Sequence, residues 1–453
     1  MLDLVFVAYL LGILALGLKR PFIWVLAYLY VDIVAPQMIS WGFLSSLPVS
    51  LIMFLAAFGG WLVLDSKQGT RFTYRQGLLL LLLCYCAYTT SVAEFREEAL
   101  TKWDWVWKAL VFAIFLPLTL RTRLRIEAVV LIMVLSAAAI IISGGMKTAT
   151  GGGGYGVLRL LVDNNAGLYE GSIISTVAIA IIPLIIWLTK HGTIYPPEWR
   201  VTIFAIALFF ACALMPIGTQ ARTGLVCLAL LCAMALRTMK RRFLYLGLMV
   251  GAGVLVVPFL PQSFTERMST IENHQSDQSA STRIAVWKWT LDYVRVHPFG
   301  GGFEAYRGNK LKFETTAAET AGATTIVRSQ VVEDEARAYH SSYFEMLGEQ
   351  GFPGLLLWLW LQASGLWQME LIRRRWKDRT GPDEQWQAPL ANALQQAQLV
   401  YLFGSFFVGI AFQPFILMLI GLQCGLWSYL KRIDVRPRRA LVPRREMKPM
   451  PAA

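Results

Sequence analysis

Apolar runs of roughly 17 to 22 residues recur along the chain, and each is long enough to cross a hydrocarbon core of about 30 Å as a helix. Of the 453 residues, 56% are hydrophobic and 16% are charged, whereas soluble domains carry about 25% charged residues. The net charge of +13 does not indicate a nucleic-acid partner, because it lies in short clusters between apolar runs. The sequence therefore predicts an all-α polytopic membrane protein, in contact with membrane lipids, with about 12 transmembrane helices. The runs Leu4–Leu18 and Phe22–Val34 are short, so the count is 12 or 13.

Basic clusters separate the apolar runs, and the positive-inside rule assigns such clusters to the cytoplasm. They begin at Lys19, Lys67, Arg121, Lys190, Arg237, Arg373 and Lys431. The connections between them then lie on the outer side. The predicted organisation is a transmembrane helical body over 1–260, an outer loop domain over 261–342, further transmembrane helices over 343–432 and a basic cytoplasmic tail over 433–453.

The outer loop domain is expected to be largely helical. Thr282–His297 places four apolar side chains at helical spacing on one face: Ile284, Trp287, Leu291 and Val294. Such an amphipathic helix packs on a membrane-embedded body, and Pro298 stops it. A polar stretch rich in alanine and threonine follows to about Gln330. A second helix is predicted from Glu333 through His340 into the membrane.

Two arginines on the outer side are exceptions to the positive-inside rule. Arg222 lies in a connection of only a few residues, at or just below the outer membrane surface, where an unpaired arginine costs a few kcal/mol. It either reaches lipid headgroups or binds an anionic ligand. Arg283 begins the amphipathic helix and either pairs with Glu272 or Asp277 or joins Arg222. Two guanidiniums at this interface can clamp a diphosphate, because arginine offers planar, bidentate donors to phosphate oxygens.

His340 lies where the second outer helix is predicted to enter the bilayer. A neutral imidazole there can accept a proton from an attacking hydroxyl near neutral pH. A single histidine can equally have a purely structural role.

The pattern of acidic residues favours chemistry without a metal. Enzymes that hold Mg²⁺ or Mn²⁺ beside a diphosphate need clustered carboxylates, but the first outer connection, Pro36–Leu47, contains no acid. The dense acidic cluster Glu333–Glu335 is interleaved with Arg328 and Arg337, which indicates a solvated, ion-paired surface. Arginine is therefore the predicted source of positive charge, and no metal or cofactor is expected.

Three segments in a fixed order carry a resemblance to a known family. They are the outer turn Gln220–Gly224, the segment Ser281–Phe303 with Arg283 and the Gly300–Gly302 run, and the segment His340–Gly354. In this topology they resemble the O-antigen ligase and polymerase superfamily of bacterial inner-membrane proteins. The family has asparagine after the histidine of its third motif, whereas this chain has Ser341.

The resemblance implies a metal-independent, inverting membrane glycosyltransferase of the GT-C type. Such an enzyme moves a glycan from undecaprenyl diphosphate to an acceptor hydroxyl at the periplasmic face of the inner membrane. In the ligase branch the acceptor is the lipid A-core oligosaccharide, and the product is complete lipopolysaccharide. Arg222 and Arg283 would bind the diphosphate, and His340 would orient or deprotonate the acceptor.

Other functions remain open at this stage. An O-antigen polymerase and a protein O-oligosaccharyltransferase of the same superfamily would use the same three residues. A secondary transporter would need ionisable residues near the bilayer midplane beside breaks in its helices. The breaks at Pro183 and Pro216 have no acid nearby, which favours an interfacial enzyme.

Overall fold

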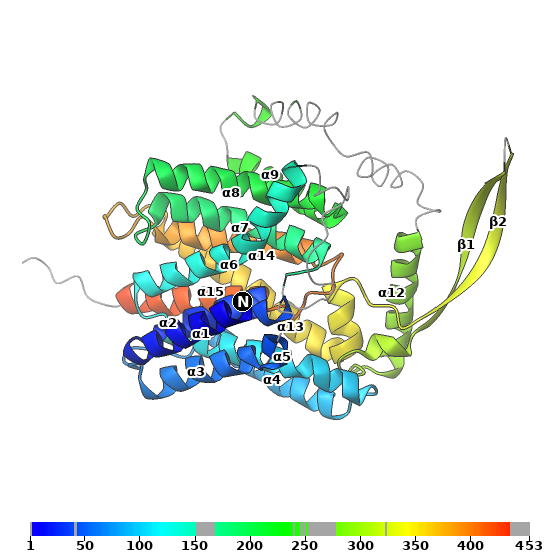
Figure 1. Ribbon diagram of the computed structural model, residues 1–453, viewed down its shortest axis with the longest axis horizontal. Coiled ribbons are helices and arrows are strands. Elements are labelled where there is room, and N and C mark those ends of the chain that lie inside the picture. Colours follow the sequence, from blue (N-terminus) through cyan, green and yellow to red (C-terminus); the bar gives the residue numbers. More distant parts are fainter. Residues whose placement is uncertain are drawn as a thin grey trace, which may run out of the picture.

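The computed structural model describes residues 2–39, 43–150, 168–238, 278–321 and 324–434, with a few residues between 241 and 251. Long helices lie side by side and form the body of the molecule (Figure 1). They are α1 (Leu2–Lys19), α2 (Phe22–Val34), α3 (Val49–Val63), α4 (Tyr74–Ser91), α5 (Arg96–Thr119), α6 (Arg123–Ala149), α7 (Gly171–His191), α8 (Trp199–Gly218), α9 (Arg222–Thr238), α13 (Ser342–Trp376), α14 (Gln387–Gly404) and α15 (Pro414–Asp434). The predicted tail and residues 261–277 lie outside the described ranges.

Four of the described helices are long and apolar enough to cross a membrane: α6, α7, α8 and α15. The apolar stretches of α1, α2 and α3 are shorter. Large apolar side chains lie exposed on the outside of the body, among them Val63, Trp199 and Phe210. A helix surface of this kind suits lipid rather than water. The prediction of an all-α membrane body is confirmed, whereas the count of about 12 transmembrane helices stays a prediction.

Contacts between connections define two ends of the body. At one end, Arg125 forms an ion pair with Asp65 at 2.6 Å, and the Arg123 guanidinium donates to the carbonyl of His191. At the other end, the backbone N–H of Glu94 donates to the carbonyl of Gly301. The first end carries the basic clusters that begin at Arg121 and Lys190, whereas the side of the membrane that each end faces stays a prediction. The end with Glu94 and Gly301 is called the outer end.

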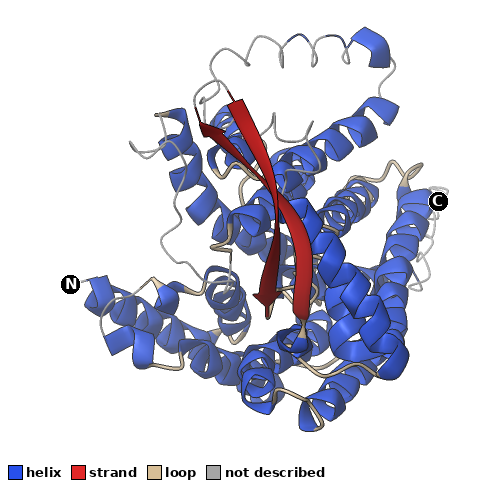
Figure 2. Ribbon diagram, turned by 90° about the vertical axis from the view of Figure 1, so that its right-hand side faces the viewer, coloured by secondary structure: helices blue, strands red, loops and turns tan. Residues whose placement is uncertain are grey.

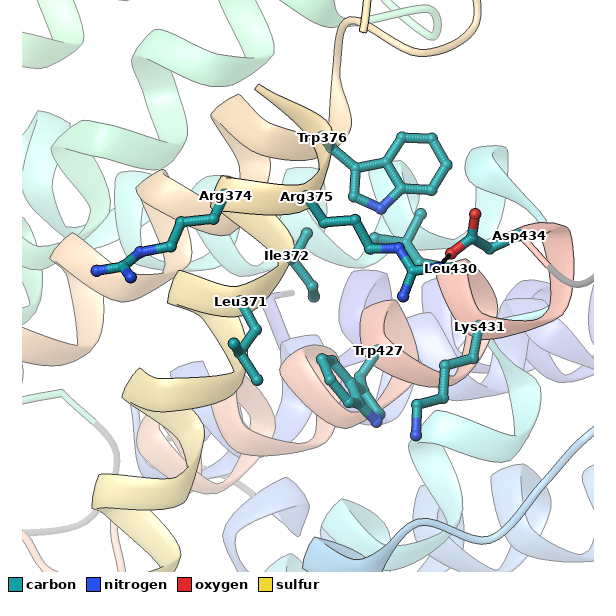
Figure 3. Close-up of a pocket in the computed structure, with 9 residues that line it drawn as sticks. All are labelled: Leu371, Ile372, Arg374, Arg375, Trp376, Trp427, Leu430, Lys431 and Asp434. Carbon is teal, nitrogen blue, oxygen red and sulfur yellow. Dashed lines mark ion pairs between the residues drawn. The ribbon is translucent and has the colours of Figure 1, made fainter. Parts of the chain in front are cut away.

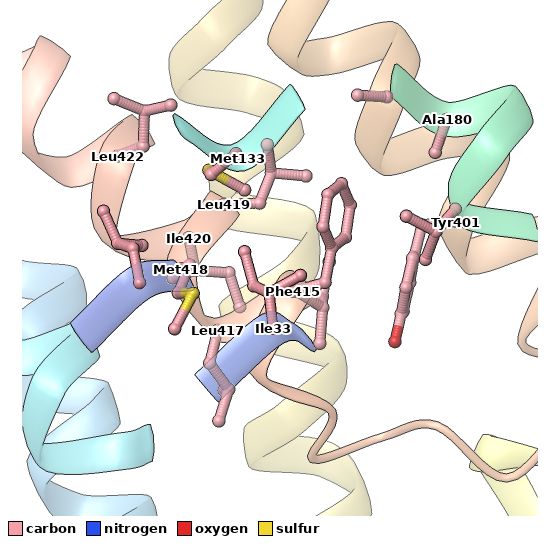
Figure 4. Close-up of a cluster of buried hydrophobic side chains, with 14 of the residues drawn as sticks. Ile33, Met133, Ala180, Tyr401, Phe415, Leu417, Met418, Leu419, Ile420 and Leu422 are labelled. Atoms are coloured by element: carbon pink, nitrogen blue, oxygen red, sulfur yellow. The ribbon is translucent and has the colours of Figure 1, made fainter. Parts of the chain in front are cut away.

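The core is centred on α15, which is buried on nearly every face. Figure 4 shows its side chains from Phe415 to Leu422 between Ile33, Met133 and Tyr401 of three other helices. A helix that is apolar all round is expected inside a bundle. Small residues bring α15 close to α5: a Cβ at Gly421 would lie 3.1 Å from the Leu116 side chain.

The predicted amphipathic outer helix is present as α12 (Gln278–Val296) and packs against α13. Its buried face differs from the prediction. Val286, Thr290 and Val294 are fully buried, whereas Ile284 and Leu291 are 51% and 45% exposed. Thr290 can lie on the buried face because its hydroxyl donates to the Val286 carbonyl at 2.8 Å, which satisfies the polar group.

Residues 310–321 and 324–335 of the outer segment form a β-hairpin, whereas the sequence predicts a polar stretch followed by a helix from Glu333. Strands β1 (Lys310–Ala321) and β2 (Thr324–Glu335) pair antiparallel, with Lys310 opposite Glu335. They extend away from the helical end on which α12 also lies (Figures 1 and 2). The alternation in Lys-Leu-Lys-Phe-Glu and the β-branched residues of Thr-Thr-Ile-Val favour strands. Among the described residues of the outer segment, the predictions of a largely helical structure and of a helix from Glu333 are therefore wrong.

Two left-handed residues separate the hairpin from α13. Ala336 and His340 have φ values of +55° and +47°, and α13 begins only at Ser342. The predicted ion-paired acidic surface is present in part, since Asp334 pairs with Arg337 and Glu335 lies 3.4 Å from Lys310.

Candidate functional site

Two glycine-rich segments form a joint at the outer end of the body. The N–H of Gly301 donates to the Gly348 carbonyl at 3.0 Å, and the N–H of Gly302 donates to the Glu349 carbonyl at 2.9 Å. Gly300 and Gly351 both have positive φ, and a Cβ at Gly300 would lie 2.4 Å from the Glu349 oxygen. Only glycine fits such an approach of two backbones. The segments Ser281–Phe303 and His340–Gly354 therefore meet here, and their contact fixes the end of α12 relative to α13.

A buried charge network lies beside this joint. The ammonium of Lys102 in α5 lies 2.7 Å from the Glu345 carboxylate and 2.8 Å from that of Glu349. The N–H of Glu304 donates to Glu349 at 3.0 Å, and the N–H of Ala411 donates to Glu345 at 3.2 Å. The network connects α5, the glycine-rich segment, the first turns of α13 and the loop after α14. Buried carboxylates need such partners to remain charged.

His340 lies next to this network, in the connection that precedes α13. Its neighbours Tyr339 and Ser341 are buried, at 3% and 1% exposure, while the imidazole itself remains accessible. The following residue, Ser342, donates its N–H to the Ser405 carbonyl at 2.8 Å and its hydroxyl to Val408 at 2.9 Å. These bonds hold the backbone beside His340 in the left-handed conformation, which is costly for a residue other than glycine.

Arg283 is held close to His340 by the packing of α12. Trp287 lies one helical turn after Arg283, on the same side of the helix. Its indole N–H donates to the carbonyl of Tyr339 at 2.9 Å, and its ring stacks on Phe344 at 4.8 Å. The structure thus brings together two of the three predicted site residues. Glu272 and Asp277, the alternative partners of Arg283, lie outside the described residues.

The pKa of His340 is lowered from the usual histidine value. Partial removal of the imidazole from water is the largest cause, the positive charge of Arg283 is the next, and Arg337 adds to it. Glu170 acts in the opposite direction. Burial and nearby positive charge both disfavour the charged imidazolium, whereas nearby negative charge favours it. A lowered pKa favours the neutral imidazole, which is the form that can accept a proton.

Arg222 is the first residue of α9 and is half-buried. The turn before it contains Gln220 in a left-handed conformation, with φ of +52°. This turn packs on the first turn of α7, where the hydroxyls of Thr219 and Ser175 lie 2.8 Å apart. A Cβ at Gly224 would lie 2.7 Å from that of Ser175, so the glycine allows this approach.

The first turn of α7 connects Arg222 with the other two site residues. Glu170 caps α7 by accepting a hydrogen bond from the N–H of Ile173 at 2.7 Å. The same carboxylate is close enough to His340 to act on its charge. Arg222 is therefore connected to the region of His340 through the start of α7.

Four residues of this region were missed by sequence reasoning: Glu170, Lys102, Glu345 and Glu349. Glu170 stands alone between two apolar runs, and Lys102 is far along the chain from its partners. The pair Glu345 and Glu349 gave a usable signal, because two acids four residues apart share one helix face at the start of an apolar helix. Within the described ranges, no group of three or more histidine, cysteine, aspartate or glutamate side chains is arranged to hold a metal ion.

Ser341, which replaces the asparagine of the resembling family, is the residue before α13. Its hydroxyl is buried and has no hydrogen-bond partner among the described residues. No described contact of the Ser341 side chain explains the change from asparagine to serine.

Comparison with protein families gives two matches that together cover most of the chain. Residues 1–193 match a family of unknown function, DUF5935. Residues 206–359 match the family described as O-antigen ligase, and this range contains Arg222, Arg283, His340 and the glycine-rich joint. A search of curated proteins gave no match. The membrane body, the ordered motifs and the family match agree: residues 206–359 form an O-antigen ligase domain of the O-antigen ligase and polymerase superfamily.

Proposed function

We propose that this protein transfers a glycan from undecaprenyl diphosphate to a hydroxyl of the lipid A-core oligosaccharide and so completes lipopolysaccharide. The reaction would take place at the periplasmic face of the bacterial inner membrane, on a body of the GT-C type. The observation that carries this proposal is the approach of Arg283 to an accessible, neutral His340 at the outer end of the helices. A polyprenyl carrier keeps its tail in the bilayer and its diphosphate at this depth.

The proposed reaction is a single displacement. His340 accepts the proton of the acceptor hydroxyl while that oxygen attacks the anomeric carbon of the glycan. The bond between this carbon and the diphosphate oxygen breaks, and its electron pair leaves with the diphosphate. Arg222 and Arg283 stabilise the added negative charge through bidentate hydrogen bonds. One displacement inverts the anomeric configuration.

The positive charge needed by the leaving group is proposed to come from the two arginines rather than from a metal. Arg222 also begins α9, and the N-terminus of a helix favours an anion through its dipole and its unpaired N–H groups. Arg283 lies on the helix that the glycine-rich joint fixes in place. Both cations are thus held by regular structure, which reduces the reorganisation needed as charge develops.

Glycan transfer is expected to fall as the pH drops through the pKa of His340, because protonated imidazole cannot act as a base. Arg337→Gln removes a cation that lowers this pKa, so the acidic limb of the pH profile should move to higher pH. Glu170→Gln removes the anion that raises it, so the same limb should move to lower pH. Initial rates between pH 4.5 and 8 measure both shifts. Shifts in one common direction would contradict the role of His340 as the base.

The function is tested by reconstituting the purified protein with undecaprenyl-diphosphate glycan and lipid A-core. The expected product is glycan-bearing lipid A-core with inverted anomeric configuration, formed equally well in EDTA. Longer carrier-linked glycan would instead identify a polymerase. Transfer only to serine or threonine of an added protein would identify a protein ligase. Loss of activity in EDTA, with recovery on adding Mg²⁺, would overturn the metal-free mechanism.

A further inference from the structure

A cavity of about 410 Å³ lies between the last turns of α13 and α15, at the end of the body opposite the site (Figure 3). Its wall is apolar and includes Trp376 and Leu430, which are buried. Its polar rim is formed by three cations and one acid: Arg374, Arg375, Lys431 and Asp434. An apolar wall with a basic rim suits a ligand that has both a hydrocarbon part and a negative charge.

Positive charge exceeds negative charge around this cavity. Two carboxylates beside the cavity are each shared by two arginines: Asp434 by Arg375 and Arg379, and Glu370 by Arg373 and Arg374. The Lys431 ammonium lies 4.7 Å from the centre of the Trp427 ring and forms no ion pair with any described residue. Helices α13 and α15 both end here, and the negative ends of their dipoles disfavour an anion. The excess of basic side chains offsets this effect.

The cavity lies at the depth of lipid headgroups. Helix α15 is one of the candidate membrane spans, and the cavity occupies its last two turns, from Trp427 to Asp434. Tryptophan prefers the interface between headgroups and acyl chains. On α13, the apolar side chains of Leu371 and Trp367 continue from the cavity along the surface and are 39% and 64% exposed. They form a path along which an acyl chain can lie.

We propose that this cavity binds an anionic phospholipid of the membrane, with its phosphate at the basic rim and the start of an acyl chain against Trp427 and Leu371. The basic clusters assign this end of the body to the cytoplasm, where anionic lipids attract basic residues near the surface. The bound lipid would neutralise the excess positive charge and hold the ends of α13 and α15 together. The proposal does not depend on the glycan-transfer reaction.

The proposal is tested by native mass spectrometry of the full-length protein in a neutral detergent, titrated with phosphatidylglycerol, phosphatidylcholine or inorganic phosphate. Phosphatidylglycerol is expected to remain bound where the other two do not. The variant Lys431→Gln should weaken this binding about fivefold, and Arg374→Gln with Lys431→Gln more than tenfold, since each basic residue near the surface contributes a comparable amount. Both side chains are exposed, so the folded body should be retained.

A matched control removes two charges at the same end but outside the cavity, by Lys190→Gln with Lys377→Gln, and should leave the binding unchanged. Equal binding of phosphatidylglycerol and phosphatidylcholine would overturn the proposal. An equal loss in the control pair would show a general charge effect instead of a site. Inorganic phosphate that binds as tightly as the lipid would show that a free anion is the ligand.

Discussion

Replacement of His340 by alanine is expected to lower glycan transfer by about 10²–10⁴-fold, the usual contribution of a general base. Arg222→Ala and Arg283→Ala are each expected to lower it by about 10²–10³-fold, because each removes a donor to the leaving diphosphate. The rates are measured with the purified protein and its lipid-linked donor at pH 7. Melting temperatures of the three variants, measured beside the rates, separate a loss of transfer from a loss of fold.

Two neighbouring residues provide matched controls. Arg295 lies on the same helix as Arg283 and pairs with Asp292 in an exposed ion pair, and His297 is an exposed histidine stacked on Tyr293. Alanine at either position should leave the rate within about threefold, because exposed ion pairs and surface stacking contribute under about 1 kcal/mol. Full activity of any of the three site variants, or equal losses in the controls, would refute the assigned roles.

Lys102→Met is expected to destabilise the protein by about 3–5 kcal/mol, because it leaves the carboxylates of Glu345 and Glu349 buried without their cation. The outer end should unfold first, since this network joins α5, α13 and the loop after α14. Thermal unfolding in detergent, and hydrogen exchange of the segment around Ser342, measure the effect.

A triple variant separates the effect of the Lys102 charge from the effect of its packing. Lys102→Met combined with Glu345→Gln and Glu349→Gln removes the unpaired charges and should recover part of the lost stability, because neutral amides cost less to bury than carboxylates. The control Lys147→Met changes an exposed lysine at the end of α6 and should have an effect below about 0.5 kcal/mol. No recovery in the triple variant would show that Lys102 acts through shape alone.

The sequence predicted the features that depend on local pattern and on the membrane as solvent. Apolar runs long enough to span a bilayer indicate helices, because the backbone must satisfy its own hydrogen bonds in lipid. The basic clusters predicted two sets of connections, and contacts of Arg123 and Arg125 bring the clusters at Arg121 and Lys190 together at one end. Arg222, Arg283 and His340 stood out for the same reason, since charged or ionisable side chains on the outer side are unusual in such a chain.

Only the tertiary structure decided which residues meet. Thr290 faces inward because its hydroxyl bonds within the helix, so polarity alone misassigned the buried face of α12. Residues 310–321 and 324–335 form strands because they pair with each other. The sequence of one strand does not show whether a partner strand is present. Lys102 meets Glu345 and Glu349 across more than 240 positions of the chain. Local periodicity fixes the type of an element, whereas contacts at such separations depend on the packing of the whole body.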